Sequence, residues 1–265
     1  MKMLKWMLSL AAVAALTLSC SKSEPKILVL YYSQSSNTRT LAKEFQKQLG
    51  ADIEEIVAVE PYTGSMQDID QRRNADQSRG VLPEIEPLKS DISKYDIIFL
   101  GYPIWGGTFA DPVKTLISQI DFTGKKVVPF CSFGSGGIDT SSRDLAAALK
   151  GATVLPGYGV RAARISAAPG EVAQFLRENG FVEGDFVKLD EFPAAHAVND
   201  AESAIFDAAV GDYPMINAKA TEVAMRDIPG GVEYLFSADS QGANPIKVYV
   251  TVEDGKAPEF TQVLR

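Results

Sequence analysis

The chain has 265 residues, of which 46% are hydrophobic and 23% charged, a balance typical of globular proteins rather than of disordered, collagenous or multi-span membrane chains. Its formal net charge of −8 repels phosphate backbones, so nucleic-acid binding is not expected. The single histidine, His196, and the two cysteines, Cys20 and Cys131, are too few to form a tetrahedral zinc site. We therefore expect no metal centre built from these residue types.

Residues 1–19 are predicted to form a signal peptide. Lys2 and Lys5 precede an apolar run over 7–18 that is too short to span a bilayer. The stretch 16–20, Leu-Thr-Leu-Ser-Cys, resembles the lipobox of bacterial lipoproteins, in which the cysteine becomes the lipidated first residue. Residues 20–25 would then be a lipidated tether, and the protein would be exported and anchored to the bacterial cell envelope, in the periplasm or at the outer membrane. Plain secretion with a free or paired Cys20 is the alternative.

Residues 26–188 alternate short apolar runs with amphipathic segments, which predicts βαβ units and a doubly wound parallel sheet. Strands are expected at 27–31, 53–59, 97–101, 127–131 and 153–160. Helices are expected at 38–49, 112–120, 141–149 and 169–179, with a shorter one at 66–75 in a long polar crossover. Cys131 falls in the fourth strand, where an inert core thiol is expected.

Residues 189–265 have a different pattern, which predicts a second, small α+β domain. A helix is expected over 200–210, followed by four strands without intervening helices. Alternating apolar residues and explicit turns place those strands at 218–225, 232–238, 246–252 and 260–264. The pattern is typical of a helix packed on an antiparallel meander.

A polar loop follows the first predicted strand and leads directly into a helix. We refer to Ser33, Gln34, Ser35, Ser36, Asn37 and Thr38 as the hydroxyl loop. Its side-chain donors, the free N–H groups of the helix start and the positive end of the helix dipole suit a phosphate. No lysine is placed as in a P-loop and no dinucleotide glycine fingerprint is present. An ordinary helix cap rich in serine and threonine is the alternative.

Two further loops follow the third and fourth predicted strands. The first contains Pro103, Ile104, Trp105, Gly106 and Gly107, and a tryptophan in such a glycine-rich surface loop suggests contact with a flat ligand. The second, which we refer to as the glycine loop, is Gly134, Ser135, Gly136 and Gly137, whose lack of bulk lets backbone approach a ligand. In an open α/β sheet, ligands bind beyond the carboxyl ends of the strands, so the three loops predict one site.

These features resemble the flavodoxin-like family, and most closely the flavodoxin-like lipoproteins of Gram-negative bacteria. The resemblance covers residues 26–188 and is strongest in the hydroxyl loop, in 96–105 and in 121–130. It implies a five-stranded sheet of order 2-1-3-4-5 and an FMN cofactor, with the hydroxyl loop on the phosphate, Trp105 stacked on the ring and the glycine loop bordering its far side. Relatives often have a second bulky residue after the tryptophan, where this chain has Gly106, so a half-open ring or weaker FMN retention would follow.

Residues 201–264 faintly resemble a cystatin-type fold. The inhibitory glutamine-valine-valine-alanine-glycine turn is absent, so protease inhibition is not expected.

Three functions fit these observations to different degrees. The first is an FMN-binding redox protein that exchanges electrons with a small quinone-like acceptor or a redox partner, with no catalytic side chain of its own; an FMN-dependent oxidoreductase of the NAD(P)H:quinone type is one form of it. The second is a non-enzymatic flavodoxin-fold module on the envelope that has lost FMN. A hydrolase comes third, because His196, the only imidazole, lies between the domains rather than after a strand.

Overall fold

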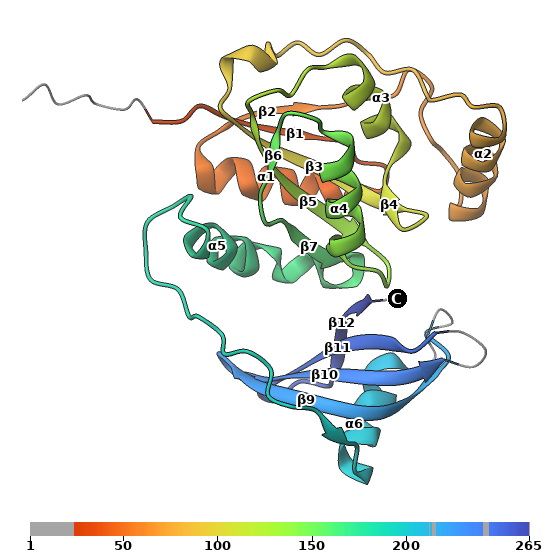
Figure 1. Cartoon of the computed structure of the whole chain (residues 1–265), viewed down its shortest axis with the longest axis vertical. Helices are drawn as coiled ribbons and strands as arrows, with labels where there is room; N and C mark the ends of the chain where they lie inside the picture. The colour runs from red at the N-terminus through yellow and green to blue at the C-terminus, as the bar shows by residue number, and fades with distance from the viewer. Residues whose placement is uncertain (1–23, 212, 214–215, 241–243, 265) are drawn as a thin grey trace, which may run out of the picture.

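The computed structural model describes residues 24–211, 213, 216–240 and 244–264 (Figure 1). The predicted signal peptide, Cys20 and residues 21–23 of the predicted tether lie outside these ranges. Within the described ranges, no helix is both long and apolar enough to cross a membrane.

A parallel sheet forms the centre of the N-terminal domain, residues 24–178. Its strands pair in the order β2-β1-β3-β5-β6, with β7 also on β5, and every one of these pairings is parallel. This confirms the predicted doubly wound sheet of order 2-1-3-4-5. The strands are β1 (Ile27–Tyr31), β2 (Asp52–Glu55), β3 (Ile97–Trp105), β5 (Lys126–Phe133), β6 (Thr153–Val154) and β7 (Tyr158–Arg161).

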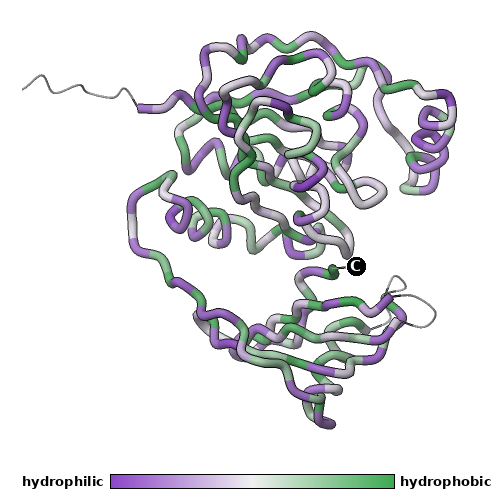
Figure 2. The backbone as a smooth tube through the Cα atoms, in the orientation of Figure 1, coloured by the Kyte–Doolittle hydropathy of each residue, from purple (hydrophilic) through white to green (hydrophobic). Residues whose placement is uncertain are grey.

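Helices cover both faces of this sheet, so its central strands are buried. Alternate residues of β1 serve opposite faces: Leu28 and Leu30 pack with α3 and α4, and Val29 packs with α1 and α5. Apolar residues are correspondingly concentrated along the strands in Figure 2. The helices are α1 (Asn37–Leu49), α2 (Met66–Ser78), α3 (Asp111–Gln119), α4 (Ile138–Ala148) and α5 (Ala168–Glu178), with 3₁₀ turns η1 (Ile92–Lys94) and η2 (Ala162–Ala167).

Two predicted strands differ from those observed. The one expected over 53–59 ends at Glu55, because residues 57–59 leave β1 and pair antiparallel with 84–86. The one expected over 153–160 is divided into β6 and β7 around Pro156, which has no N–H to donate to a ladder.

The third predicted strand differs more, because it does not end at residue 101. β3 continues to Trp105 and turns back into β4 (Thr108–Phe109) as a two-residue hairpin, with Trp105 opposite Thr108. The expected loop after the third strand is therefore largely a β-hairpin.

The C-terminal domain, residues 196–264, is a helix packed on an antiparallel sheet of order β12-β11-β10-β9-β8. The meander was predicted with four strands, and the two-residue β8 adds a fifth. The predicted boundary at 188/189 falls in a segment, 179–195, without helix or strand. Its elements are β8 (His196–Ala197), α6 (Asp200–Val210), β9 (Ala218–Ile228), β10 (Gly231–Ser240), β11 (Ile246–Glu253) and β12 (Glu259–Leu264).

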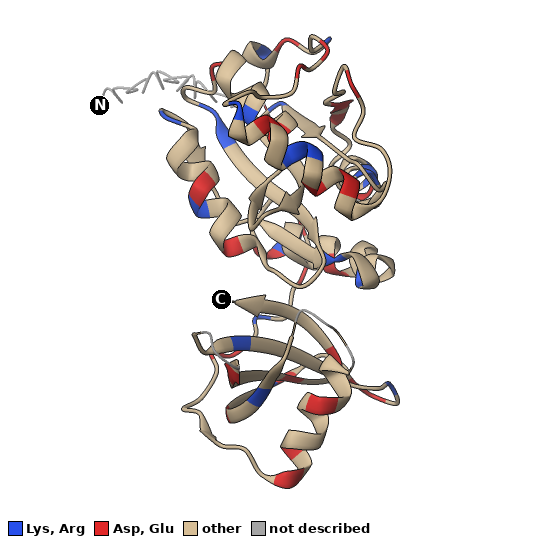
Figure 3. Ribbon diagram, turned by 90° about the vertical axis from the view of Figure 1, so that its right-hand side faces the viewer, with Lys and Arg blue, Asp and Glu red and all other residues tan. Residues whose placement is uncertain are grey.

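The core of the C-terminal domain forms between α6 and the sheet, where Phe206 and Phe236 are fully buried with ring centroids 5.2 Å apart. A capping box between Asn199 and Glu202 begins α6. β12 lies next to the N-terminal domain in both ribbon views (Figures 1 and 3), and it contacts β7. Lys and Arg are interspersed with Asp and Glu over both domains in Figure 3.

Candidate functional site

The carboxyl ends of β1, β3 and β5 bring the three predicted loops to one edge of the sheet. These strands are direct neighbours, with Tyr31 opposite Gly101 and Gly101 opposite Phe130. A hydrogen bond joins the first and third loop regions, because the hydroxyl oxygens of Thr38 and Ser132 lie 2.9 Å apart. The predicted site residues are therefore on adjacent strand ends, as the doubly wound topology requires.

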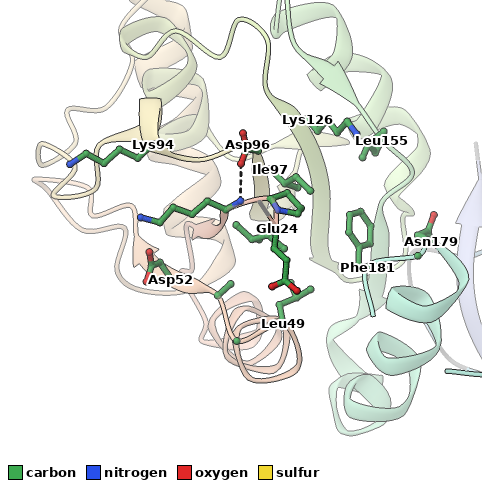
Figure 4. Close-up of a pocket in the computed structure, with 16 residues that line it drawn as sticks. Glu24, Leu49, Asp52, Lys94, Asp96, Ile97, Lys126, Leu155, Asn179 and Phe181 are labelled. Carbon is green, nitrogen blue, oxygen red and sulfur yellow. Dashed lines mark hydrogen bonds between the residues drawn. The ribbon is translucent and has the colours of Figure 1, made fainter. Parts of the chain in front are cut away.

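A surface pocket of about 1120 Å³ lies at the opposite edge of the sheet (Figure 4). It is lined by residues at the strand starts, including Asp52, Asp96, Ile97 and Lys126. Ligands of open α/β sheets bind at the carboxyl ends of the strands, so the candidate site is assigned to the three loops and not to this pocket.

The backbone of the hydroxyl loop is strained at Ser36. This residue precedes α1 with a φ of 70°, and it is the one non-glycine residue with positive φ in the described part of the chain. The Ser36 side chain makes no capping hydrogen bond to its own helix. A left-handed residue that does not cap its helix differs from the ordinary N-cap considered above.

Donors at the start of α1 are only partly used. The Arg39 N–H donates to Ser33 Oγ (3.1 Å) and the Thr40 N–H to the Ser36 carbonyl (2.9 Å). The N–H groups of Asn37 and Thr38 belong to the first turn and have no acceptor within the helix. Together with the exposed hydroxyls of Ser35 and Ser36, they form a cluster of neutral donors at the positive end of the helix dipole.

The nearest cation, Arg39, contacts this cluster only through a long hydrogen bond from Nη1 to Ser36 Oγ (3.4 Å). Arg39 Nη2 lies 2.7 Å from Glu55 Oε1 on β2, an ion pair that neutralises it. Thr38 is also less available than expected, because its side chain is buried and its hydroxyl already contacts Ser132. If Ser132 donates in that pair, the Thr38 proton is free for another acceptor.

Trp105 is not the exposed loop residue that was expected. It is 4% exposed and packs against the Tyr62 ring, with centroids 4.9 Å apart, and edge-on against Tyr32 at 5.6 Å. The Arg73 guanidinium lies 5.7 Å from the Trp105 centroid. The inference from exposure is therefore wrong: the hairpin and the crossover carrying Tyr62 bury this side chain.

Gly106 and Gly107 form the turn of the hairpin, with φ of 57° and 85°. A two-residue hairpin turn with positive φ at both positions favours glycine. A Cβ at Gly106 would lie 2.8 Å from Arg73 Nη2. Arg73, which is buried and paired with Asp111 at 3.4 Å, therefore occupies the space next to Gly106.

Tyr62 is a site residue that the sequence did not indicate. It is 5% exposed, and its hydroxyl has no hydrogen-bond partner among the residues that the structure describes. It lines a cavity of about 240 Å³ together with Tyr32, Ser33 and Gln34 of the first loop. Burial raises the pKa of Tyr62 to about 12, so the phenol is neutral at physiological pH.

The glycine loop borders the C-terminal domain rather than open solvent alone. Arg161, the last residue of β7, donates from Nε to the Gly134 carbonyl at 3.0 Å. Gly134 is exposed, Gly136 and Gly137 are half-buried, and Ser135 is buried. Arg161 was also absent from the predicted site, since nothing in its local sequence distinguishes it from a solvent-facing arginine.

The other chemistry-bearing residues lie elsewhere. Cys131 is fully buried, and burial raises the pKa of its thiol well above its ordinary value, as expected for an inert core thiol. His196 is on β8 of the C-terminal domain, with Nε2 2.9 Å from Glu202 Oε1.

A family model described as Flavodoxin matches residues 26–169, more than half of the chain. The chain belongs to the flavodoxin family. The cofactor of this family is FMN. The match ends before the C-terminal domain, whose likeness to cystatins stays an expectation.

Solved structures with the same fold include a Bacteroides uniformis protein provisionally named a flavoprotein, at 25% identity and a TM-score of 0.50 over 56% of this chain and 98% of that one. A similarly named Bacteroides eggerthii protein is 28% identical, with a TM-score of 0.47 over 56% and 98% of the two chains. A Lactobacillus acidophilus flavoprotein in complex with FMN is 25% identical, with a TM-score of 0.47 over 51% and 93%. No curated protein matches the chain.

Proposed function

We propose that this flavodoxin-family protein binds FMN at the three loops and transfers electrons between a donor and a small quinone-like acceptor or a redox partner. The observation that carries the proposal is the start of α1, where the strained Ser36 and the free N–H groups of Asn37 and Thr38 form a neutral anion site. A phosphate is the anion that the family's cofactor would place there.

The residues at this edge fit the parts of FMN. The hydroxyl loop would hold the phosphate, Trp105 and the adjoining hairpin backbone would contact one side of the ring, and the glycine loop would border the other. Bound FMN supplies the ability to accept and release electrons. The protein contributes binding, orientation and shielding from water, and no side chain has to act as a nucleophile or a general base.

Trp105 must become accessible for ring stacking. Tyr62 packs on Trp105 from the crossover, so the segment carrying Tyr62 would shift, or the ring would bind at the Trp105 edge. The unpartnered Tyr62 hydroxyl offers a hydrogen bond on the same side of the site. Its orphaned state is consistent with a bound group that supplies the missing partner.

An FMN titration tests the proposal. We expect the wild-type chain to bind FMN stoichiometrically and the double variant Ser35→Ala/Asn37→Ala to bind about 10- to 100-fold more weakly, since a hydrogen bond to a charged group contributes about 1.5–3 kcal/mol. Thr40→Ala is the matched control on the same helix, because its hydroxyl contacts the Ser36 carbonyl rather than the loop exterior. Trp105 emission, read in a Trp6→Phe background that leaves it the single tryptophan, should be quenched as FMN binds.

Absence of binding by the wild-type chain would favour the alternative, a flavodoxin-fold module that has lost FMN. If FMN binds, adding NADH or NADPH with and without a quinone distinguishes an oxidoreductase from a carrier that needs a protein partner.

We also propose that the protein acts on the cell envelope, held there by lipid on Cys20. The lysines, apolar run and lipobox-like stretch before Cys20 support this placement.

A further inference from the structure

The C-terminal domain contacts the glycine loop directly. β12 lies beside β7, and the Val263 N–H donates to the Gly136 carbonyl at 3.2 Å. Gln262 Nε2 approaches Asp139 Oδ2 at 3.3 Å just beyond the loop. The domain that falls outside the family match therefore touches one of the three loops assigned to the cofactor.

Arg161 is the centre of this contact. It is 7% exposed and donates from Nε to the Gly134 carbonyl (3.0 Å) and from Nη1 to the Phe260 carbonyl of β12 (2.7 Å). Its guanidinium lies 3.4 Å from the centroid of the Phe260 ring. The buried, planar guanidinium of Arg161 thus connects the glycine loop to the last strand of the other domain.

Two glycines of the loop lie close to side chains of the C-terminal domain. A Cβ at Gly137 would lie 2.3 Å from Gln262 Nε2, and one at Gly134 would lie 3.1 Å from the hydroxyl of Tyr213. Both neighbours belong to the C-terminal domain. The small residues of this loop therefore accommodate the second domain as well as any ligand.

The two contacts also orient the loop backbone. In a trans peptide, the C=O and the following N–H point in opposite directions. The Gly134 carbonyl is directed to Arg161 of β7 and the Gly136 carbonyl to Val263 of β12, so the Ser135 N–H points away from Arg161 and the Gly137 N–H points away from β12. The Gly137 N–H is thus presented on the side of the loop that β12 does not cover, and the Ser135 N–H on the side opposite the Arg161 guanidinium.

We propose that the C-terminal domain is a structural part of the FMN site, and that Arg161 acts as a positioning residue that fixes the glycine loop with the Ser135 and Gly137 N–H groups directed to the flavin ring. This inference rests on the proposed FMN binding. It explains why a buried arginine ends β7, directly opposite Phe133 at the start of the loop.

Arg164 provides a matched control. It also joins the two domains, since its guanidinium lies 3.0 Å from Glu171 and 3.1 Å from Glu259, but no hydrogen bond connects it to the glycine loop in the described part of the chain. Arg161→Ala and Arg164→Ala therefore each remove a cross-domain arginine, the first buried and the second half-buried, and only Arg161→Ala removes a hydrogen bond to the glycine loop.

The test compares FMN affinity, the visible circular dichroism of bound flavin and thermal unfolding in the full chain. We expect Arg161→Ala to bind FMN about tenfold more weakly or worse, with an altered dichroism band, since about 1.4 kcal/mol of lost positioning corresponds to tenfold. Arg164→Ala should keep the wild-type affinity and band. Arg161→Lys keeps the positive charge but lacks the planar guanidinium, so its affinity for FMN should lie between those of Arg161→Ala and the wild type.

Equal affinities and spectra in Arg161→Ala and Arg164→Ala would overturn this inference while leaving FMN binding intact. A wild-type chain that binds no FMN would overturn the proposed function, and this inference with it. Should Arg161→Ala fail to fold, Arg161→Lys decides, because a folded lysine variant with wild-type affinity and spectrum contradicts a positioning role.

Discussion

Ser36 and Tyr62, two residues at the carboxyl edge of the sheet, are each held in an unfavourable state. Ser36 has left-handed backbone, which costs a non-glycine residue roughly 1–2 kcal/mol. Tyr62 buries a hydroxyl without a partner, a further cost of about 1–3 kcal/mol. Folding of the sheet requires neither, and such costs concentrate where a protein binds a ligand.

Replacing Tyr62 by phenylalanine should make the FMN-free protein more resistant to alkali. Burial raises the pKa of Tyr62 from 10.0 to about 12, so the unfolded chain loses this proton at lower pH than the folded one. The contribution of Tyr62 to stability is complete below pH 10 and is lost as the pH rises toward 12. Tyr62→Phe has no such proton and should lose less stability over that interval.

Denaturant unfolding at pH 8, 10 and 11 measures this effect, with Tyr213→Phe, a half-buried tyrosine of the C-terminal domain, as the control. At pH 8 the Tyr62→Phe variant should equal or exceed the wild type, because an unsatisfied polar group has been removed. A loss of more than about 1 kcal/mol at pH 8 would mean that the hydroxyl has a partner after all.

At the scale of elements, the hairpin of β3 and β4 places Trp105 and sets the space around it. Its turn needs left-handed backbone at both glycines, and α2 places Arg73 against the first of them. The hairpin and α2 are therefore interdependent, although residues 79–96 of the chain separate them.

This dependence predicts different costs for the two turn glycines. Gly107→Ala meets no atom within 4 Å and should cost only the left-handed strain, about 1–2 kcal/mol. Gly106→Ala carries the same strain and must also displace Arg73 from its buried pair with Asp111. We expect it to be the more destabilising of the two in thermal or denaturant unfolding.

The reverse order, or equal costs, would show that Arg73 moves aside freely. An Arg73→Ala background checks the cause, because the difference between the two alanine variants should vanish when the guanidinium is absent.

The parts of the fold that the sequence predicted are those with local signals. Alternating and β-branched runs placed β1, β5 and the C-terminal meander, and amphipathic spacing placed α1 and α6 within a residue or two. The hairpin was not predicted, because the sequence Trp105-Gly106-Gly107-Thr108 is typical of a glycine-rich loop. Two adjacent glycines also suit the central positions of a two-residue hairpin turn. The ends of β2 and β7 depend on non-local pairing with 84–86 and with β5, which no local window contains.

The candidate site likewise contains residues that the sequence predicted and residues that only the structure revealed. Its three loops follow from strand ends and a motif, whereas Tyr62, Arg73 and Arg161 reach it from a long crossover, a peripheral helix and an edge strand. Each is recognisable only by its contacts: an orphaned hydroxyl, a guanidinium against Gly106 and a guanidinium shared between two domains.

At the scale of the whole molecule, the described chain enters the sheet at the edge opposite the proposed site. Residues 24–26 line the pocket at the strand starts in Figure 4, directly before β1, and β1 ends at the hydroxyl loop. Five residues of strand span about 17 Å at roughly 3.3 Å each. A chain tethered through Cys20 would hold the strand starts closest to the membrane and leave the FMN edge accessible to partners.

Cys20→Ala should therefore release the protein from the membrane without changing its affinity for FMN. A lipid-modified terminus gains about 0.8 kcal/mol per buried CH₂, and the variant loses this entire contribution while the carboxyl edge of the sheet is untouched. Membrane fractionation and FMN titration measure the two effects, and Cys131→Ala, which removes the other cysteine from the core, controls for loss of a thiol. A Cys20→Ala protein that stays as firmly membrane-bound as the wild type, with its signal processed normally, would contradict the lipid anchor. A released protein with weakened FMN binding would instead contradict the separation of anchor and site by the length of the sheet.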